Sequence, residues 1–436
     1  MLNIPTVGSL GNKAKPIIQA FTQLNKRETI ADEEIADGKN LSSELFPEMT
    51  CRPSRELINT IALPNALFSA NNKLCYVSGT NFYYDGIVKG AVTASTKSMV
   101  DFNGKIIIMP DKKYYDYITG IFGVIGGGAY PVAGSCPDID FVASHANRLY
   151  GVKGNNFYGT SLGEYNDWTT FAGDNLDAYA VDLVEPGQFT GIVAYQQHIV
   201  MWKPDYFFEN YGSYPAQYQQ QQICEIGCID GRTAAEVNNR LYFLGRRGIY
   251  EYGGGLPSLI SETLNETFIA GVAYSDGRRY YISAQRADST WKLYVYDTWR
   301  AMWLPEDDLQ VVGFAGIDNV TYALAVGGEL YKFNSGTEVV DWEIKTKNFD
   351  DGTMGRKNVS GLKVQVELDE GSLIDIYLSV DNMAYNLIKS ISQYGYNNIA
   401  ATFRVQRGQR YKFKIVVKGI ARIRGFRREF VVGGDI

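Results

Sequence analysis

Seven segments of the chain share one local pattern, and this internal repeat limits the fold more than any other feature. Each segment has a strand-forming approach, a small polar turn, aliphatic and aromatic residues, a second turn and a strand rich in Tyr or Phe. Such a repeat predicts a fold that uses one supersecondary unit many times. The segments are 71–86, 102–117, 146–161, 195–210, 237–252, 275–297 and 318–336.

Each segment has the pattern of a β-hairpin. In VNNRLYFLGRRGIYEY (237–252), Asn238-Asn239 form the entry turn and Arg246-Arg247-Gly248 form the tip. The composition agrees, because Tyr (31 residues) favours pleated, half-buried surfaces and Gly (45 residues) favours tight turns. Apolar runs precede several hairpins and would supply an inner strand for each unit: 139–143, 189–194, 268–273 and 311–316.

The spacing of the hairpins distinguishes between β architectures. They recur at intervals of about 30 to 55 residues, the period of a four-stranded propeller blade. One blade cannot bury both of its faces, so a closed ring of blades is the stable outcome. The sequence therefore predicts an all-β chain with a β-propeller of six or seven blades over 61–340. An array of β-sandwiches is the alternative, but recurrence of the hairpin motif itself favours the propeller.

The two ends of the chain differ from the repeat. Residues 1–60 are polar and acidic with little periodicity, which predicts an extended arm packed on the propeller or on a neighbouring subunit. Residues 341–436 alternate cleanly, and KVQVEL (363–368) and KFKIVV (412–417) place apolar side chains on one face. We expect a small C-terminal β-sandwich there.

Charge is unevenly distributed between these parts. From Asp341 onward the chain has about 16 Lys and Arg and about 11 acidic residues, a local net charge near +5. The preceding part must therefore carry about −11 to give the net charge of −6. An acidic body does not attract nucleic acid by counterion release and is compatible with a surface that DNA passes without binding. The last 36 residues hold about ten Lys and Arg and two acids. That run is either a solvated strand face or a surface that docks on an acidic neighbouring subunit.

The sequence predicts no membrane segment, since it has no stretch of 18 or more apolar residues. Its start lacks the features of a signal peptide, so we expect folding in a cytoplasm. The cysteines are odd in number and their spacing is a poor metal signature, which predicts reduced, structural thiols. They are Cys51, Cys75, Cys136, Cys224 and Cys228.

Propellers host glycosidases, whose mechanism needs two carboxyl groups across the scissile bond. Candidate carboxylates are abundant, but nothing in the sequence pairs them. The sialidase-type Asp-box is absent; SVDNMAY (379–385) comes nearest, but it lacks the Gly and lies outside the expected propeller. The candidates are Asp138, Asp140, Asp182, Glu185, Asp276 and Asp297.

Other catalytic patterns are also missing from the sequence. His145 and His198 are the only histidines, and no Gly-x-Ser-x-Gly elbow accompanies them, so we interpret both as structural. The glycine-rich segments 125–131 and 252–257 lack the phosphate-binding pattern and are interpreted as turns. Gln219–Gln222 are expected in a surface loop. We therefore assign no catalytic, cofactor-binding or metal-binding residue.

Three stretches carry a resemblance to a family of tailed-phage proteins, the packaged-DNA stabilisation and tail-nozzle proteins. The first is IADEEIADGKNLSSELFPEMTCRPSR (30–55), and the second is ANRLYGVKGNNFYGTSLGEYNDWTTF (146–171). The third combines LYVYDTWRAMW (293–303) with WEIKTKNFDDGTMGRKNVSGLKV (342–364) and LSVDNMAY (378–385). These weak motifs are spread over most of 30–436, and the chain looks shorter than many nozzle proteins.

The resemblance implies a non-enzymatic structural protein of a virion tail. It implies a homo-oligomeric ring, often six-fold, that contacts other tail or connector proteins and surrounds a channel for packaged DNA. Acidic propellers would suit a lumen that repels phosphate, and the basic C-terminal domain would contact acidic neighbours. The alternatives are a host-recognition module that binds a cell-surface glycan and a glycosidase acting on envelope sugars.

Overall fold

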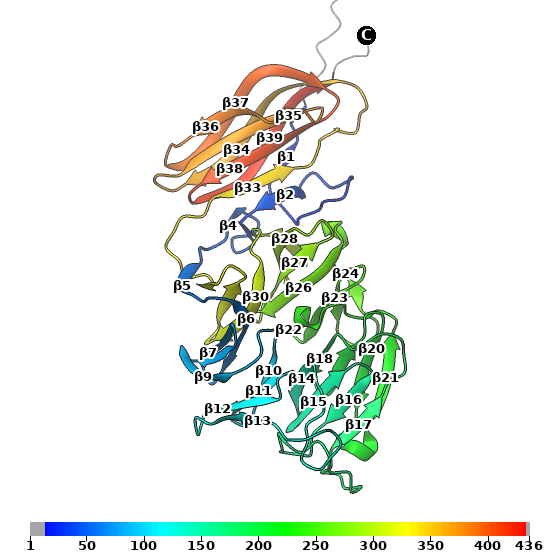
Figure 1. The fold of residues 1–436 in the computed structure, drawn as a ribbon. Helices are drawn as coiled ribbons and strands as arrows, with labels where there is room; N and C mark the ends of the chain where they lie inside the picture. Colours follow the sequence, from blue (N-terminus) through cyan, green and yellow to red (C-terminus); the bar gives the residue numbers. More distant parts are fainter. Residues whose placement is uncertain (1–13, 433–436) are drawn as a thin grey trace, which may run out of the picture.

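The computed structural model describes residues 14–432 of the chain. Within this range the only helical elements are three short 3-10 helices, and all other regular structure is β. They are η1 (Pro215–Gln217), η2 (Gly231–Thr233) and η3 (Glu262–Leu264). The strands form a propeller and a sandwich, which lie one above the other in Figure 1. Over residues 14–432, no helix has the length and apolar character needed to cross a membrane.

The described residues form seven propeller blades, each an antiparallel sheet of four strands. From the inner to the outer strand, blade 1 is β6 (Pro64–Ala70), β7 (Lys73–Ser78), β8 (Asn81–Tyr84) and β9 (Ile87–Ala91). Blade 2 is β10 (Ser98–Phe102), β11 (Lys105–Met109), β12 (Lys113–Asp116) and β13 (Phe122–Val124). Blade 3 is β14 (Phe141–His145), β15 (Arg148–Lys153), β16 (Asn156–Gly159) and β17 (Tyr179–Asp182).

The remaining four blades follow the same order. Blade 4 is β18 (Gly191–Tyr195), β19 (His198–Trp202), β20 (Phe207–Tyr211) and β21 (Gln219–Cys224). Blade 5 is β22 (Ala235–Val237), β23 (Arg240–Gly245), β24 (Gly248–Tyr252) and β25 (Ser258–Leu259). Blade 6 is β26 (Phe268–Ser275), β27 (Arg279–Arg286), β28 (Trp291–Asp297) and β29 (Met302–Pro305). Blade 7 is β30 (Val311–Ile317), β31 (Val320–Ala325), β32 (Glu329–Lys332) and β5 (Glu56–Thr60).

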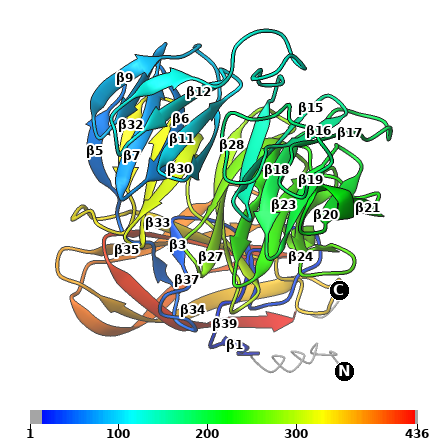
Figure 2. The same cartoon turned by 90° about the horizontal axis from the view of Figure 1, so that it is seen from below.

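The hairpins predicted from the repeat are the two middle strands of the seven blades, and the prediction of a propeller is confirmed. The four apolar runs match the inner strands β14, β18, β26 and β30. Neighbouring inner strands lie side by side, β10 with β14, β14 with β18, and β30 with β6. In Figure 2 the blue and cyan blades 1 and 2 lie on one side of the centre and the green blades 3 to 5 on the other.

Asparagine marks the hairpins because the turns between first and second strands require positive φ. Asn71 and Asn72 have φ of 48° and 54°, and Asn238 and Asn239 have φ of 50° and 59°. Two central residues with positive φ define a type I′ turn, whose twist matches that of the paired strands, and Asn tolerates this conformation well. The polar entry turns of the repeat thus fix the register of each blade.

The propeller is closed by a strand from the N-terminal arm. β5 pairs with β32, with Leu57 opposite Tyr331 and Glu56 opposite Lys332, so blade 7 joins both ends of the repeat. The propeller therefore begins at Glu56, and the boundary expected between residues 60 and 61 is corrected by this strand. Every residue of β5 is exposed, so no apolar alternation reveals it in the sequence.

The C-terminal sandwich also takes strands from the arm. One sheet has the order β1-β39-β34-β37 and the other β2-β33-β38-β35-β36. The arm strands are β1 (Ile17–Ile18) and β2 (Ile35–Lys39), and a short pair, β3 (Leu41–Ser42) and β4 (Thr50–Cys51), follows them. The other sandwich strands are β33 (Trp342–Thr346), β34 (Lys357–Leu368), β35 (Leu373–Val380), β36 (Asn386–Ile391), β37 (Gly395–Gly408), β38 (Tyr411–Lys418) and β39 (Ala421–Val432). The arm is thus part of both domains and more than a segment packed on the propeller.

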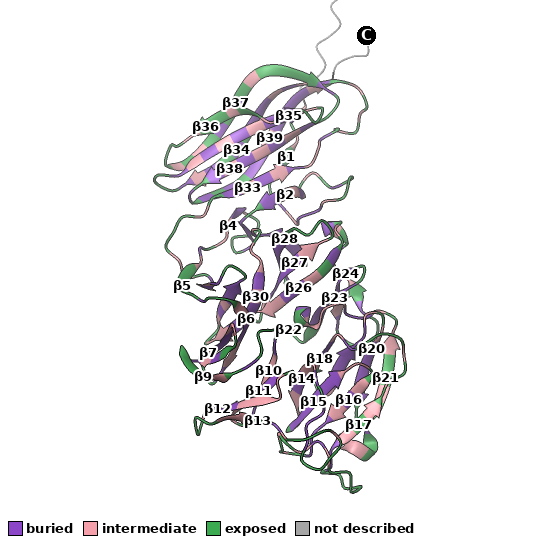
Figure 3. Cartoon of the chain, in the orientation of Figure 1, coloured by how far each residue is buried: buried purple, intermediate pink, exposed green. Residues whose placement is uncertain are grey.

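A single hydrophobic core continues from the propeller into the sandwich. It contains Leu244 and Trp303 of blades 5 and 6, Leu24 of the arm, and Ile344 and Ile415 of the sandwich. The backbone NH of Leu24 donates to the carbonyl of Trp303 at 2.9 Å. Figure 3 shows buried residues along the strands on both sides of the arm. The arm therefore lies between two domains that share one core.

Candidate functional site at the channel mouth

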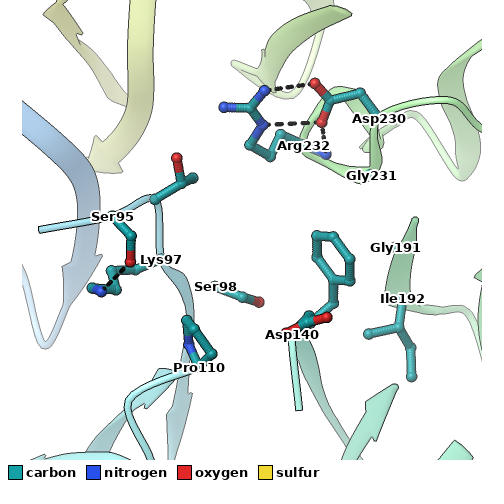
Figure 4. Close-up of a pocket in the computed structure, with 12 residues that line it drawn as sticks. Ser95, Lys97, Ser98, Pro110, Asp140, Gly191, Ile192, Asp230, Gly231 and Arg232 are labelled. Carbon is teal, nitrogen blue, oxygen red and sulfur yellow. Dashed lines mark hydrogen bonds and ion pairs between the residues drawn. The ribbon is translucent and has the colours of Figure 1, made fainter. Parts of the chain in front are cut away.

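A cavity of about 560 Å³ opens where several chain segments enter the inner strands of the propeller, and we call this cavity and its rim the channel mouth. It is bounded by the segments before β10, β14 and β18 and by η2 before β22, as Figure 4 shows. A smaller cavity of about 150 Å³ shares Thr96, Lys97 and Arg232 with it and extends along β6, β26 and β30. The lining of the larger cavity is Ser95, Thr96, Lys97, Ser98, Pro110, Asp140, Phe141, Gly191, Ile192, Asp230, Gly231 and Arg232.

A close backbone approach fixes one wall of this cavity. A Cβ atom on Gly231 would lie 2.5 Å from the Cα of Gly191 and 2.5 Å from the carbonyl oxygen of Thr190. The backbone NH of Gly231 donates to that same carbonyl at 3.0 Å. Blades 4 and 5 therefore touch through glycine backbone here, and this contact places Asp230 and Arg232 at the mouth of the channel.

Arg232 and Asp230 form a bidentate ion pair at the rim of the cavity. Arg232 donates from Nε to Asp230 Oδ1 at 3.0 Å and from Nη2 to Oδ2 at 2.6 Å. The hydrogen bond to Asp230 raises the pKa of Arg232. Bidentate pairs of this kind hold both side chains in a fixed geometry. In Figure 4 the guanidinium lies across the cavity from Asp140.

Lys97 is the second cation of the channel mouth, and its side chain is fully buried. Its Nζ lies 2.5 Å from Asp111 Oδ2 and donates to Thr93 Oγ1 and Ser95 Oγ at 2.7 Å each. Although burial raises the pKa of Asp111, hydrogen bonds from Lys97 and Thr93 lower it by more. The three donors of the ammonium group are therefore used within the fold.

Asp140 is the one glycosidase candidate that lines the cavity. Its carboxylate lies 3.2 Å from Lys153 Nζ, and both side chains are partly exposed. The other lining carboxylate, Asp230, is held by Arg232. Glycoside hydrolysis requires two carboxyls across the scissile bond. Here each lining carboxylate already has a cationic partner.

The other candidate carboxylates are not brought to this cavity. Asp138 pairs with Lys112 at 2.7 Å, and Asp182 ends β17, the outer strand of blade 3. Glu185 lies in the following loop, where its carbonyl accepts a hydrogen bond from Lys203. Asp276 accepts from the backbone NH of Arg279 at 2.7 Å in an entry turn, and Asp297 is buried near the arm. The six residues therefore do not form one site.

His198 belongs to a polar network inside the propeller. Its Nε2 lies 2.8 Å from Oε1 of the fully buried Glu209, which also accepts from the Tyr252 hydroxyl at 2.7 Å. This network ties blade 4 to blade 5. His145 is the last residue of β14 and pairs with Arg148 in the sheet.

Two sequence interpretations concern loops. Gln219–Gln222 are not in a loop but in β21, where Gln220 and Gln221 pair with Asn210 and Glu209. The expectation was wrong because an outer blade strand makes backbone hydrogen bonds on one side while its side chains stay in water. The glycine-rich segment 252–257 does form the turn between β24 and β25.

All five cysteines are free, and three of them are buried. Burial raises the pKa of Cys75, Cys136 and Cys228 to about 12, whereas Cys51 and Cys224 are half-buried with smaller rises. Because the thiolate is the reactive form, we expect N-ethylmaleimide to modify only Cys51 and Cys224 in the native protein near pH 8. Mass spectrometry of native and denatured samples checks this. Rapid native modification of Cys228 would contradict it.

Sequence reasoning missed the channel mouth itself. Lys97 and Arg232 are single cations in segments between blades, about 130 residues apart, and no local pattern joins them. The tight Asp230-Gly231 turn before a strand is the one signal the sequence offers. Among the described residues, no group of three His, Cys, Asp or Glu side chains is arranged to hold a metal ion.

Comparisons with known proteins define no family for this chain. No protein-family model matches it, and no curated protein matches it. Among solved structures it is similar to PorZ of the Porphyromonas gingivalis type-IX secretion system (14% identity, TM-score 0.45) and to BamB of Moraxella catarrhalis (8%, 0.41). It is also similar to an exo-β-1,3-galactanase of Phanerochaete chrysosporium (7%, 0.24).

The extent of these matches differs. They cover 64%, 74% and 76% of this chain and 38%, 99% and 95% of PorZ, BamB and the galactanase, respectively. The chain thus spans well under half of PorZ. The assignment of a propeller rests on the strand pairing of the protein itself.

Proposed function

We propose that the chain is a non-catalytic structural protein of a tailed-phage virion, a ring-forming subunit of the tail nozzle or adaptor type. The observation that carries this proposal is the place of the stretches that resemble that family. The first stretch (30–55) and the third (293–303 and 342–364) meet at the junction of arm, propeller and sandwich.

The arm is bonded to blade 6 through the Asn-Leu-Ser-Ser motif of the first stretch. Ser43 Oγ donates to Asp297 Oδ2 at 2.6 Å, and Asp297 belongs to the Tyr-Asp-Thr-Trp-Arg motif of the third stretch. Asp297 is completely buried and also accepts from Arg300 Nη1 at 2.8 Å. Glu44, next in the arm, pairs with Arg278 and Arg279 of blade 6.

The same arm is bonded to the sandwich. β2 pairs with β33, with Lys39 opposite Glu343, and Lys345 Nζ donates to Asp37 Oδ2 at 2.8 Å. The buried Arg428 of β39 pairs with Asp351 at 2.6 Å and with Asp32 of the arm. Joints of this kind hold the propeller and the sandwich at fixed relative positions. A subunit that bears load in a tail needs such rigidity.

The proposal includes the partners and the place of action. Copies of the chain form a ring in the virion tail, other tail or connector proteins bind it, and packaged DNA passes without sequence-specific contact. The net charge of about −11 before Asp341 supports this last point, because an acidic surface repels phosphate.

Negative-stain electron microscopy of the purified chain, together with its mass in solution, tests the proposal. We expect rings with a central hole at micromolar concentration, or on addition of purified tail and connector components. A chain that stays monomeric with those components present would contradict the ring.

The cavity at the channel mouth favours a second candidate, a host-recognition role. Its partly exposed Arg232, Asp140 and Phe141 are the kinds of group that hold a sugar, and the volume of about 560 Å³ suits a small oligosaccharide. A glycan-array signal that is lost in Arg232→Ala would favour this role over the structural one.

A further inference from the structure

The loops of blade 3 form an acidic surface at one end of the molecule. Residues 154–202 contain six acidic residues and no Lys or Arg. Glu164, Asp174 and Asp182 are exposed, and among the described residues none of the three carboxylates forms a hydrogen bond or an ion pair with another side chain. These loops lie at the lower end of Figure 1, away from the sandwich.

Exposed apolar side chains stand between these acids. Leu162, Phe171, Leu176 and Val184 are 42%, 53%, 55% and 85% exposed. We call the surface of Leu162, Glu164, Phe171, Asp174, Leu176, Asp182 and Val184 the acidic loop patch. Exposed apolar side chains combined with charged ones are a common composition of protein–protein interfaces.

A buried arginine holds the connection between β16 and β17, which carries most of the acidic loop patch. Arg148 is 1% exposed and donates from Nη1 to the carbonyls of Thr160 at 2.6 Å and Asp177 at 2.5 Å. Its Nη2 donates to the carbonyl of Asn175 at 2.7 Å. The long connection between β16 and β17 is therefore organised before any partner arrives, which lowers the entropic cost of binding.

The sandwich presents the opposite charge. Residues 382–428 contain eleven Lys and Arg and no acidic residue. β36 and β37 are the edge strands of their two sheets, whereas the arm strands β1 and β2 occupy the opposite edges. The two open edges therefore lie along one side of the sandwich, at the upper left of Figure 1.

This side of the sandwich combines free cations with exposed apolar residues. In the part of the chain that the structure describes, Lys389, Arg404 and Arg407 have no acidic partner. Figure 3 shows that β36 and β37 are largely exposed. We call the surface of Leu387, Lys389, Tyr394, Tyr396, Arg404, Val405 and Arg407 the basic sandwich edge.

We propose that the acidic loop patch of one copy of this chain binds the basic sandwich edge of the next copy. The inference deepens the proposed function, on which it rests, by naming the two surfaces that join neighbouring subunits. Both have the same design, exposed apolar residues among unpaired charges, and the signs of those charges are opposite. The complementary partner for each surface is present in the chain itself, so a second copy is the occupant.

The contact is heterologous, because two different surfaces meet. A contact of this type repeats from copy to copy and closes into a ring when the rotation between copies permits it. Opposite charges also speed encounter and exclude a like-to-like arrangement of two sandwiches or of two blade-3 loops. Ring formation is therefore expected to weaken at high ionic strength.

Charge reversal of each surface tests the contact by sedimentation velocity. One variant carries Arg404→Glu and Arg407→Glu, and the other carries Glu164→Lys and Asp174→Lys. Each is expected to weaken self-association about tenfold or more, because like charges then face each other. An equimolar mixture of the two variants is expected to associate again, since every contact between unlike variants is restored. Arg247→Glu and Glu225→Lys, exposed charges outside both surfaces, are the matched controls.

The outcomes separate this inference from the proposed function. If rings form and neither double variant weakens them, the ring stands and the named surfaces are wrong. If both variants weaken association but the mixture does not restore it, the two surfaces do not bind each other and the inference is also wrong. If the unaltered chain is monomeric even with tail components, the proposed ring itself is contradicted.

Discussion

Replacement of Arg55 by methionine is expected to lower the free energy of unfolding by about 3–5 kcal/mol. Arg55 directly precedes β5, the strand that closes the propeller, and its side chain is 7% exposed. Nη1 lies 2.7 Å from Asp307 Oδ2, and Nη2 pairs with Glu306, which is 8% exposed. Arg55→Met keeps the aliphatic part of the side chain but leaves these carboxylates buried with only Arg52 to compensate them.

The pH dependence of this effect follows from Asp307. Burial raises the pKa of Asp307, but the charges of Arg55 and Arg52 lower it by more, and the net shift is below the ordinary value of 3.8. A carboxyl with a lowered pKa stabilises the fold above pH 3.8, and that contribution is lost as the pH falls further. The unaltered protein and the variant are therefore expected to differ in free energy of unfolding by a constant amount near neutral pH. That difference is expected to become smaller below about pH 3.8.

Urea unfolding curves at neutral pH and at about pH 3 measure both effects. Arg27→Met is the matched control, because Arg27 is also an arm residue paired with a propeller carboxylate, Glu262, at 2.9 Å. Both of those side chains are largely exposed, and their pair is expected to contribute less than about 1 kcal/mol. If both variants lose the same free energy of unfolding, the burial of the Arg55 ion pairs is not what stabilises the closure of the propeller by β5.

The parts of the fold that could be predicted from the sequence are those with local signals. Each blade hairpin combines apolar alternation with an entry turn, such as Asn238-Asn239, whose φ values only a few residue types accept easily. The inner strands β18 and β26 are apolar runs because neighbouring blades cover them. Such features lie within ten to fifteen residues of each other and need no knowledge of distant contacts.

The parts that could not be predicted depend on contacts between distant segments. β1 pairs with β39 and β5 with β32, across about 410 and 270 residues, and neither short strand has an apolar alternation long enough to mark it. The channel mouth likewise depends on the backbone contact between Gly191 and Gly231 and on the position that the closed propeller gives to Lys97. A sequence shows that such residues are present, but only the closed arrangement of the seven blades determines which of them line the same cavity.

Replacement of Trp303 by alanine is expected to lower the free energy of unfolding by about 3–5 kcal/mol. Trp303 is completely buried, its ring centroid lies 4.9 Å from that of Tyr296, and its Nε1 donates to the carbonyl of Ile260 at 2.9 Å. The alanine variant leaves a cavity and an unpaired carbonyl at the point where the arm crosses blade 6.

Because the core around Trp303 continues through Leu24 into the sandwich, the replacement should destabilise both domains. Thermal unfolding followed by circular dichroism and by calorimetry is expected to show one transition at a lower temperature, with propeller and sandwich unfolding together. Trp299→Ala is the matched control four residues away, since Trp299 is 70% exposed and contacts mainly the guanidinium of Arg278, 4.7 Å from its ring centroid. Trp299→Ala is expected to lower the free energy of unfolding by about 1 kcal/mol or less. Two separated transitions in Trp303→Ala, with the sandwich unchanged, would mean that the shared core does not couple the domains and that the arm alone holds them in place.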